Sequence, residues 1–116
     1  MTIQRIAPGP RMSCAVVHGN TVYLSGHVAA EPRGSVRGQT EAILARIDER
    51  LTTAGTSRAN LLSAQIWLTD IASFDEMNAA WEAWIDPANP PARATVEARL
   101  ASPEYLVEIS VIAAKL

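Results

Sequence analysis

Two charged residues near the C-terminus have the types and surroundings that acid–base chemistry requires. Arg93 follows two prolines and opens a short strand-like segment. Glu108 interrupts the almost continuously apolar run 106–114. A carboxylate in such a run must lie on a solvated face or have a partner, because burying an unpaired charge costs several kcal/mol. Arg93 is the obvious candidate for that partner.

This pair would suit a small carboxylate substrate. Arginine grips a carboxylate through two parallel hydrogen bonds. A partly desolvated glutamate can have its pKa raised towards the range useful for proton transfer. Arg93 and Glu108 are therefore candidate catalytic residues of a cofactor-free site for proton transfer or hydration. A plain salt bridge, or two unrelated surface charges, would explain the same residues, since structural ion pairs also perturb pKa values.

The elements that must position this pair follow from apolar periodicity and turn residues. The sequence predicts strands at 13–18, 21–25, 61–68, 94–100 and 105–114, and helices at 37–54 and 74–85. The residues before the breaker cluster at 7–10 are expected to be a lead-in. Ser73 and Glu76 fit a capping box for the second helix. The order ββαβαββ predicts an α+β fold, a mixed sheet with both helices packed on one face.

The length of the chain predicts one domain, residues 1–116, because 116 residues leave no room for a second hydrophobic core. The net charge of −2 and the lack of a Lys/Arg run argue against nucleic-acid binding. No apolar run is long enough to span a membrane. Cys14 is the only cysteine, and His18 and His27 lack carboxylates at metal spacing, so no metal site is expected. The N-terminus lacks the apolar region of a signal peptide, so we expect a cytoplasmic protein.

Four motifs, in this order, resemble the Rid, or YjgF-like, reactive-intermediate deaminases. They are Val22-Tyr-Leu-Ser-Gly26, Gln39-Thr40, Pro91-Ala-Arg-Ala-Thr95 and Leu106-Val-Glu-Ile109. The resemblance covers essentially the whole chain, and the Pro-x-Arg and Val-Glu-Ile motifs are its most specific part. Within this family, the sequence most resembles the YoaB-like branch.

The resemblance implies a chorismate-mutase-like α+β fold and a homotrimer with active sites in clefts between subunits. Such proteins hydrolyse reactive enamines and imines, such as 2-aminoacrylate, to 2-keto acids and ammonia, without a metal or organic cofactor. By this resemblance, Arg93 would bind the substrate carboxylate and Glu108 would position or activate water. Gly26 and Thr95 would offer backbone contacts to the substrate, and Asn78 would lie nearby.

The sequence also departs from the family pattern. The usual Gly-Pro-Tyr-Ser is replaced by residues 9–13, so that Arg11 or Met12 stands in place of a pocket tyrosine. Thr95 stands where many members have cysteine, and His27 where many have glutamine. These changes leave the carboxylate anchor and the water-handling acid in place, but they leave the identity of the substrate open.

Two other functions remain as alternatives. One is a non-catalytic trimer that binds or senses a small carboxylate, for which the altered N-terminal motif is the reason. The other, an endoribonuclease or translation inhibitor, is disfavoured by the acidic balance. Outside the resemblance, Asn78 would be an ordinary solvent-facing helix residue. A sheet with helices on one face leaves the other face to be covered, which independently indicates an oligomer.

Overall fold

Alternating burial builds the centre of the sheet. The computed structural model describes residues 1–116. In strand β6 (Val107–Ala114) every second side chain is buried, beginning with the first. Strand β4 (Leu61–Leu68) alternates in the same way from Ala64 onward. One face of each strand therefore joins the core, as successive side chains of a strand point to opposite faces.

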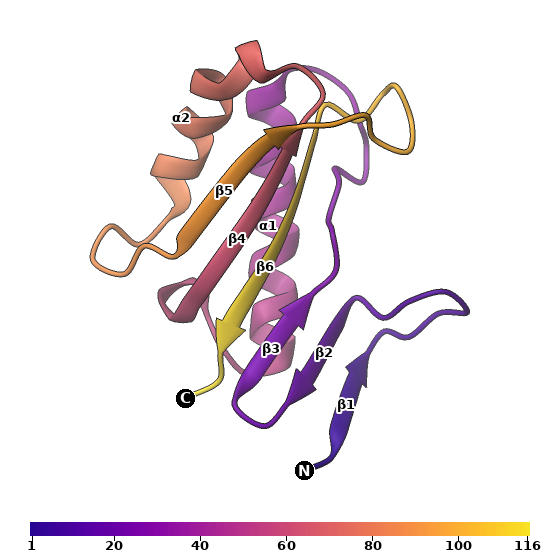
Figure 1. Cartoon of the computed structure of the whole chain (residues 1–116), viewed down its shortest axis with the longest axis vertical. Helices are drawn as coiled ribbons and strands as arrows, with labels where there is room; N and C mark the ends of the chain where they lie inside the picture. The colour runs from indigo at the N-terminus through magenta and orange to yellow at the C-terminus, as the bar shows by residue number, and fades with distance from the viewer.

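The remaining strands extend this pair on both sides (Figure 1). They are β1 (Ile3–Ile6), β2 (Ala15–His18), β3 (Thr21–Leu24) and β5 (Ala92–Glu97). The order across the sheet is β1-β2-β3-β6-β4-β5. Only β4 and β5 are parallel, and they are connected through α2 (Phe74–Trp84), as parallel neighbours require a crossover. The sheet is therefore mixed.

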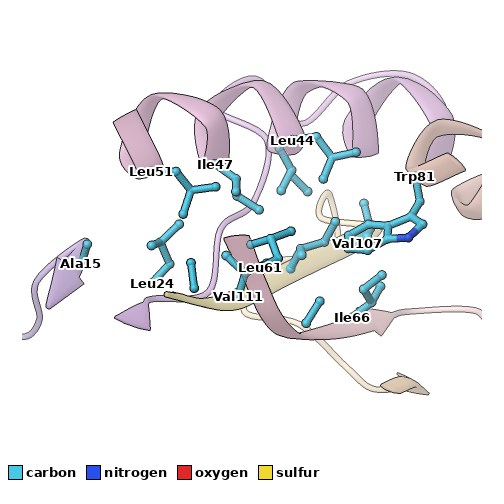
Figure 2. Packing of buried hydrophobic residues seen from close by; sticks show 14 of the residues in the cluster. Ala15, Leu24, Leu44, Ile47, Leu51, Leu61, Ile66, Trp81, Val107 and Val111 are labelled. Atoms are coloured by element: carbon cyan, nitrogen blue, oxygen red, sulfur yellow. The ribbon is translucent and has the colours of Figure 1, made fainter. Parts of the chain in front are cut away.

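Both helices lie on one face of the sheet (Figure 1). In α1 (Val36–Ala54), Ile43, Ile47 and Leu51 recur at every fourth position and are fully buried. Figure 2 shows Ile47 and Leu51 above β4 and β6, with Trp81 of α2 reaching the same core. The opposite face of the sheet carries no helix. This arrangement confirms the predicted α+β fold with two helices on one face.

Local sequence determines the ends of α1. The hydroxyl of Ser35 accepts a hydrogen bond from the amide of Gly38 at 3.0 Å, which satisfies one free N–H of the first turn. Gly55 follows the helix with φ of +87°, a conformation that favours glycine. The predicted glycine stop is thus confirmed. No helix has both the length and the apolar character needed to cross a membrane.

The prediction that the first residues form only a lead-in is wrong. Residues 3–6 form β1, which pairs antiparallel with β2, so the observed order is βββαβαββ. Three of the four side chains of β1 are exposed. An edge strand of four residues has too little apolar alternation to be recognised, and its pairing with β2 supplies the missing stabilisation.

The predicted capping box at α2 is also wrong. The short 3-10 helices η1 (Arg58–Asn60) and η2 (Ile71–Ser73) precede β4 and α2. The end of η2 gives Ser73 a near-helical backbone, and its hydroxyl donates to the carbonyl of Asp70 instead. The carboxylate of Glu76 accepts a hydrogen bond from the amide of Arg37 at 2.9 Å. Glu76 therefore links α2 to the start of α1.

Gln39, from the second of the motifs, holds the turn that leads into β6. Its side chain is buried, donates to the carbonyl of Glu104 at 3.1 Å and accepts from the amide of Leu106 at 2.9 Å. Both groups lie in the loop that separates β5 from β6. The buried side-chain amide of Gln39 therefore holds the backbone at Leu106, two residues before Glu108.

Candidate active site

Arg93 and Glu108 lie on opposite faces of the sheet. Arg93 is the register partner of the buried Ala64, so its side chain is on the helix-covered face. Glu108 lies between the buried Val107 and Ile109, so its side chain is on the open face. Neither of the two ion pairs in the chain involves them. The prediction that Arg93 is the partner of Glu108 is therefore wrong within one chain, because the pleat separates them.

The guanidinium of Arg93 is held by α2. Its Nη1 donates to Oδ1 of Asn78 at 2.7 Å. Its Cζ lies 5.7 Å from the ring centroid of Phe74 and 5.4 Å from that of Trp81. Burial lowers the pKa of Arg93, while the charge of Glu82 raises it in part. Arg93 still carries its charge and has no carboxylate partner, so the site favours an anionic ligand.

A single face of α2 supplies all three contacts to Arg93. Spacings of four and three residues place Phe74, Asn78 and Trp81 on the same side of the helix. An ordinary solvent-facing role for Asn78 is thereby excluded. The aromatic contacts of Arg93 were not predicted, although the spacing of these residues contains the signal.

Thr95 lies two residues further along β5, on the same face as Arg93. Its register partner is the buried Ile66. Its Oγ1 is buried and has no hydrogen-bond partner. Leaving a buried polar group unpaired costs about 1–3 kcal/mol. The hydroxyl of Thr95 is thus an unsatisfied polar group on the same face of the sheet as Arg93.

The carboxylate of Glu108 lies directly against Gly26. A Cβ atom on Gly26 would overlap Oε2 of Glu108. On the other side, the register partner of Glu108 is Trp67 of β4, which is partly buried on the open face. Gly26 is therefore needed for close approach, and Glu108 lies between a bare backbone and an aromatic ring.

A β-bulge between Tyr23 and His27 turns the backbone of Gly26 towards this carboxylate. Tyr23 pairs with Ile112, and His27 forms a bridge with Ile109. Between these two pairs the chain after β3 advances four residues while β6 advances three. Such an extra residue bends a strand and redirects its side chains. The sequence suggested a free backbone at Gly26, but pairing across the sheet decides where it points.

The chain matches a known protein family over almost its whole length. A family model described as Endoribonuclease L-PSP matches residues 2–115. The chain belongs to this family. The predicted membership of the YjgF-like proteins is thereby confirmed.

Relatives within the YjgF family align over nearly their whole length. A RutC family protein from Haemophilus influenzae is 43% identical, over 97% of this chain and 98% of the relative. The RutC family protein YoaB from Escherichia coli is 41% identical, over 98% and 99% respectively, which agrees with the expected likeness to YoaB. A crystal structure of a YjgF-family protein from Neisseria meningitidis superposes with a TM-score of 0.97 at 41% identity, covering 100% of this chain and 97% of that one.

Two of the three departures from the YjgF pattern, residues 9–13 and His27, lie close to Gly26, whereas Thr95 lies two residues from Arg93 on β5. The turn at 9–12 is closed by a hydrogen bond of 2.8 Å from the amide of Gly9 to the carbonyl of Met12. Both Arg11 and Met12 are exposed. The segment rejoins the sheet at Cys14, whose carbonyl accepts hydrogen bonds from the amide and hydroxyl of Ser25. The altered motif therefore adjoins Ser25, the residue before Gly26.

His27, the departure next to Gly26, is buried. It is 3% exposed, and its Nδ1 lies 2.8 Å from the carbonyl oxygen of Ser25. Burial is the main reason that the pKa of His27 is lowered; the bond to Ser25 raises it in part, and the charges of Arg46 and Arg50 lower it further. His27 is therefore neutral near pH 7.

Acid is expected to destabilise the fold through His27. At a pH between the pKa of His27 in the folded chain and its unfolded value of about 6.5, only the unfolded chain binds the proton. The free energy of unfolding therefore decreases as the pH is lowered through this range. One proton limits this slope to about 1.4 kcal/mol per pH unit. Urea unfolding of the natural chain and His27→Gln at about pH 7.5 and 5.5 measures it. His18 is common to both, so equal pH dependence in the two proteins would contradict the prediction.

Proposed function

We propose that this chain is a hydrolytic deaminase of reactive enamines and imines, converting 2-aminoacrylate-like compounds to 2-keto acids and ammonia. The observation that carries the proposal is the free, aromatic-lined guanidinium of Arg93, a receptor for a small carboxylate. The carboxylate of Glu108 against the bare backbone of Gly26 supplies a base for water. Membership of the YjgF family supports this class of reaction, which needs no metal or organic cofactor.

We propose further that each site combines two copies of the chain in a homotrimer. Arg93 and Glu108 lie on opposite faces of one sheet, so a single chain does not bring both to one substrate. The open face bears exposed apolar side chains, among them Tyr23 and Leu62. Covering that face with another copy removes them from water. The same contact would bring the edge strand β5 of one copy to the Glu108 side of the next.

Catalysis would begin with the substrate carboxylate on Arg93, whose guanidinium is oriented by Asn78. Thr95, two residues along the same strand, would offer a backbone contact to the substrate. With the imine form bound, Glu108 takes a proton from water as the oxygen bonds to the imine carbon, and it passes this proton to the nitrogen. In the resulting carbinolamine, Glu108 takes the hydroxyl proton and passes it to the amino nitrogen, the C–N bond breaks as the C=O bond forms, and ammonia leaves with the bonding pair. A 2-keto acid remains, without any redox step.

The direct test is release of keto acid from 2-aminoacrylate generated in place by a separate lyase. The protein should accelerate this release above the spontaneous rate and in proportion to its concentration. A rate equal to the spontaneous one would refute the proposal. Saturable binding of pyruvate without turnover would instead identify a carboxylate-binding protein, the alternative suggested by the altered segment at 9–13.

The family description also refers to an endoribonuclease. We do not propose that activity here, because the chain has a net charge of −2 and a single lysine, Lys115. RNA binding relies on clustered positive charge along the backbone path. RNA cleavage that persists through purification and disappears in Glu108→Gln would be needed to support it.

Gly26→Ala is expected to lower turnover while leaving the fold intact. The new Cβ would displace the carboxylate of Glu108, which is the flexible end of its side chain. The φ angle of Gly26 is not positive, so alanine is tolerated there. Because a displacement of about 1 Å can cost about 100-fold in rate, we expect kcat to fall by about 10- to 100-fold.

Gly38→Ala is the matched control for this change. A Cβ at Gly38 meets only the Ser35 hydroxyl oxygen, at an ordinary 3.5 Å. Steady-state kinetics and thermal unfolding of both variants separate the effects. Unchanged kcat in Gly26→Ala would show that the position of the Glu108 carboxylate is unimportant.

A further inference from the structure

We propose that His27 is a positioning residue that holds the Ser25–Gly26 peptide so that the Gly26 amide N–H is presented to the substrate. The inference rests on the proposed deaminase function of this site. It assigns a role to a side chain that does not itself reach the open face of the sheet. His27 would act through the peptide, and Gly26 would make the contact.

The backbone of His27 is firmly anchored. Its amide donates to the carbonyl of Ile109 at 2.8 Å, and the amide of Ile109 donates back at 3.0 Å. Nη1 of Arg46 donates to the carbonyl of the next residue, Val28, at 2.7 Å. These bonds tie the segment both to β6, one residue from Glu108, and to α1. The imidazole therefore has a fixed base from which to act.

The hydrogen bond to Ser25 determines the tautomer of His27. A carbonyl oxygen only accepts, so the hydrogen lies on Nδ1 of the neutral ring. At 2.8 Å this bond is short for an N–H···O contact, and the ring is almost completely buried. The carbonyl of Ser25 is therefore held towards the interior of the fold.

Peptide geometry transfers this constraint to Gly26. The peptide between Ser25 and Gly26 is trans, so its C=O and N–H point in opposite directions. The N–H of Gly26 donates no hydrogen bond within the chain. It points away from the imidazole, at a residue that lies against the Glu108 carboxylate. A bonded carbonyl also polarises its own N–H, which strengthens the donor.

A donor in this position matches a specific step of the proposed reaction. When Glu108 removes the hydroxyl proton of the carbinolamine, negative charge develops on the oxygen that becomes the keto oxygen. A backbone N–H held in advance stabilises such charge without reorganisation. The Gly26 amide would donate to that oxygen, and His27 would keep it aimed.

Comparing His27→Gln with His27→Leu tests the role. Glutamine supplies an amide N–H for the Ser25 carbonyl, whereas leucine supplies none. Because a removed oxyanion donor costs about 100-fold, a misdirected one in His27→Leu should lower kcat by about tenfold with KM changed less than about twofold. His27→Gln should retain most of the natural kcat. If kcat is unchanged in both variants, the proposal is overturned.

NMR of the Gly26 amide gives a readout that a purely structural role would not move. Titration with pyruvate should shift the Gly26 amide proton downfield in the natural chain and in His27→Gln, and much less in His27→Leu. If His27→Leu does not fold, the natural chain still decides: an unshifted Gly26 amide, or a ring proton on Nε2 instead of Nδ1, overturns the proposal. Lack of turnover by the natural chain would refute the deaminase function alone, since the pyruvate titration does not depend on it.

Discussion

Arg93→Ala is expected to lower kcat/KM for 2-aminoacrylate-type substrates by about 30-fold or more. Loss of one partner from a desolvated charge pair costs about 2–5 kcal/mol, and each 1.4 kcal/mol corresponds to about tenfold in rate. The guanidinium of Arg93 has no carboxylate partner in the chain, so its charge is free for the substrate. Asn78 and the aromatic rings hold it in place but do not replace it.

Arg93→Lys should recover only part of this loss. A lysine keeps the charge but lacks the planar fork that donates to Asn78 on one side and to a carboxylate on the other. Neither change should unfold the chain, because the lost cation–π contacts contribute about 0.5–2 kcal/mol. Arg99→Ala, at an exposed arginine of the following loop, is the matched control. Equal kcat/KM in Arg93→Ala and Arg99→Ala would exclude Arg93 as the carboxylate anchor.

Mixing two inactive variants is expected to restore activity. Glu108→Gln removes the base and should abolish turnover, as should Arg93→Ala. In trimers assembled at random from equal amounts of both, about one site in four would combine an intact Arg93 with an intact Glu108 from different copies. Activity of the mixture should therefore approach about a quarter of the natural value.

This complementation depends on the placement of the two residues on opposite faces of the sheet. Co-expression with two different tags would yield mixed trimers, and native mass spectrometry would confirm their composition. Mixing the separately assembled variants without exchange should give no activity. Mixed trimers without recovered activity would contradict a site shared between copies, and a monomeric mass would contradict the trimer itself.

The local sequence was a good guide to the helices and the central strands. The stripe of Ile43, Ile47 and Leu51 and the stop at Gly55 predicted α1 to within one residue of its start. The run 61–68 coincides with β4. These elements are specified by short-range periodicity and by backbone preferences of single residues.

Elements that depend on partners were missed or misassigned. The strand β1 exists through its pairing with β2, since three of its four side chains are exposed. The capping box at Ser73 failed because the preceding 3-10 helix changed the local backbone. Glu76, whose spacing fitted that box, bonds instead to α1. In each case a contact distant in sequence outweighed a local preference.

Residue types and their order along the chain identify the candidate chemistry: an arginine behind two prolines, a carboxylate in an apolar run, and motifs that identify the family. How these residues are grouped in space depends on the folded sheet. The pleat of the sheet puts Arg93 with Asn78 and Thr95 on one face and Glu108 with Gly26 on the other. Side-chain direction in a strand is known only when its register and its buried face are known. Both are properties of the paired sheet, and they separate the two candidate catalytic residues into two halves of a proposed site.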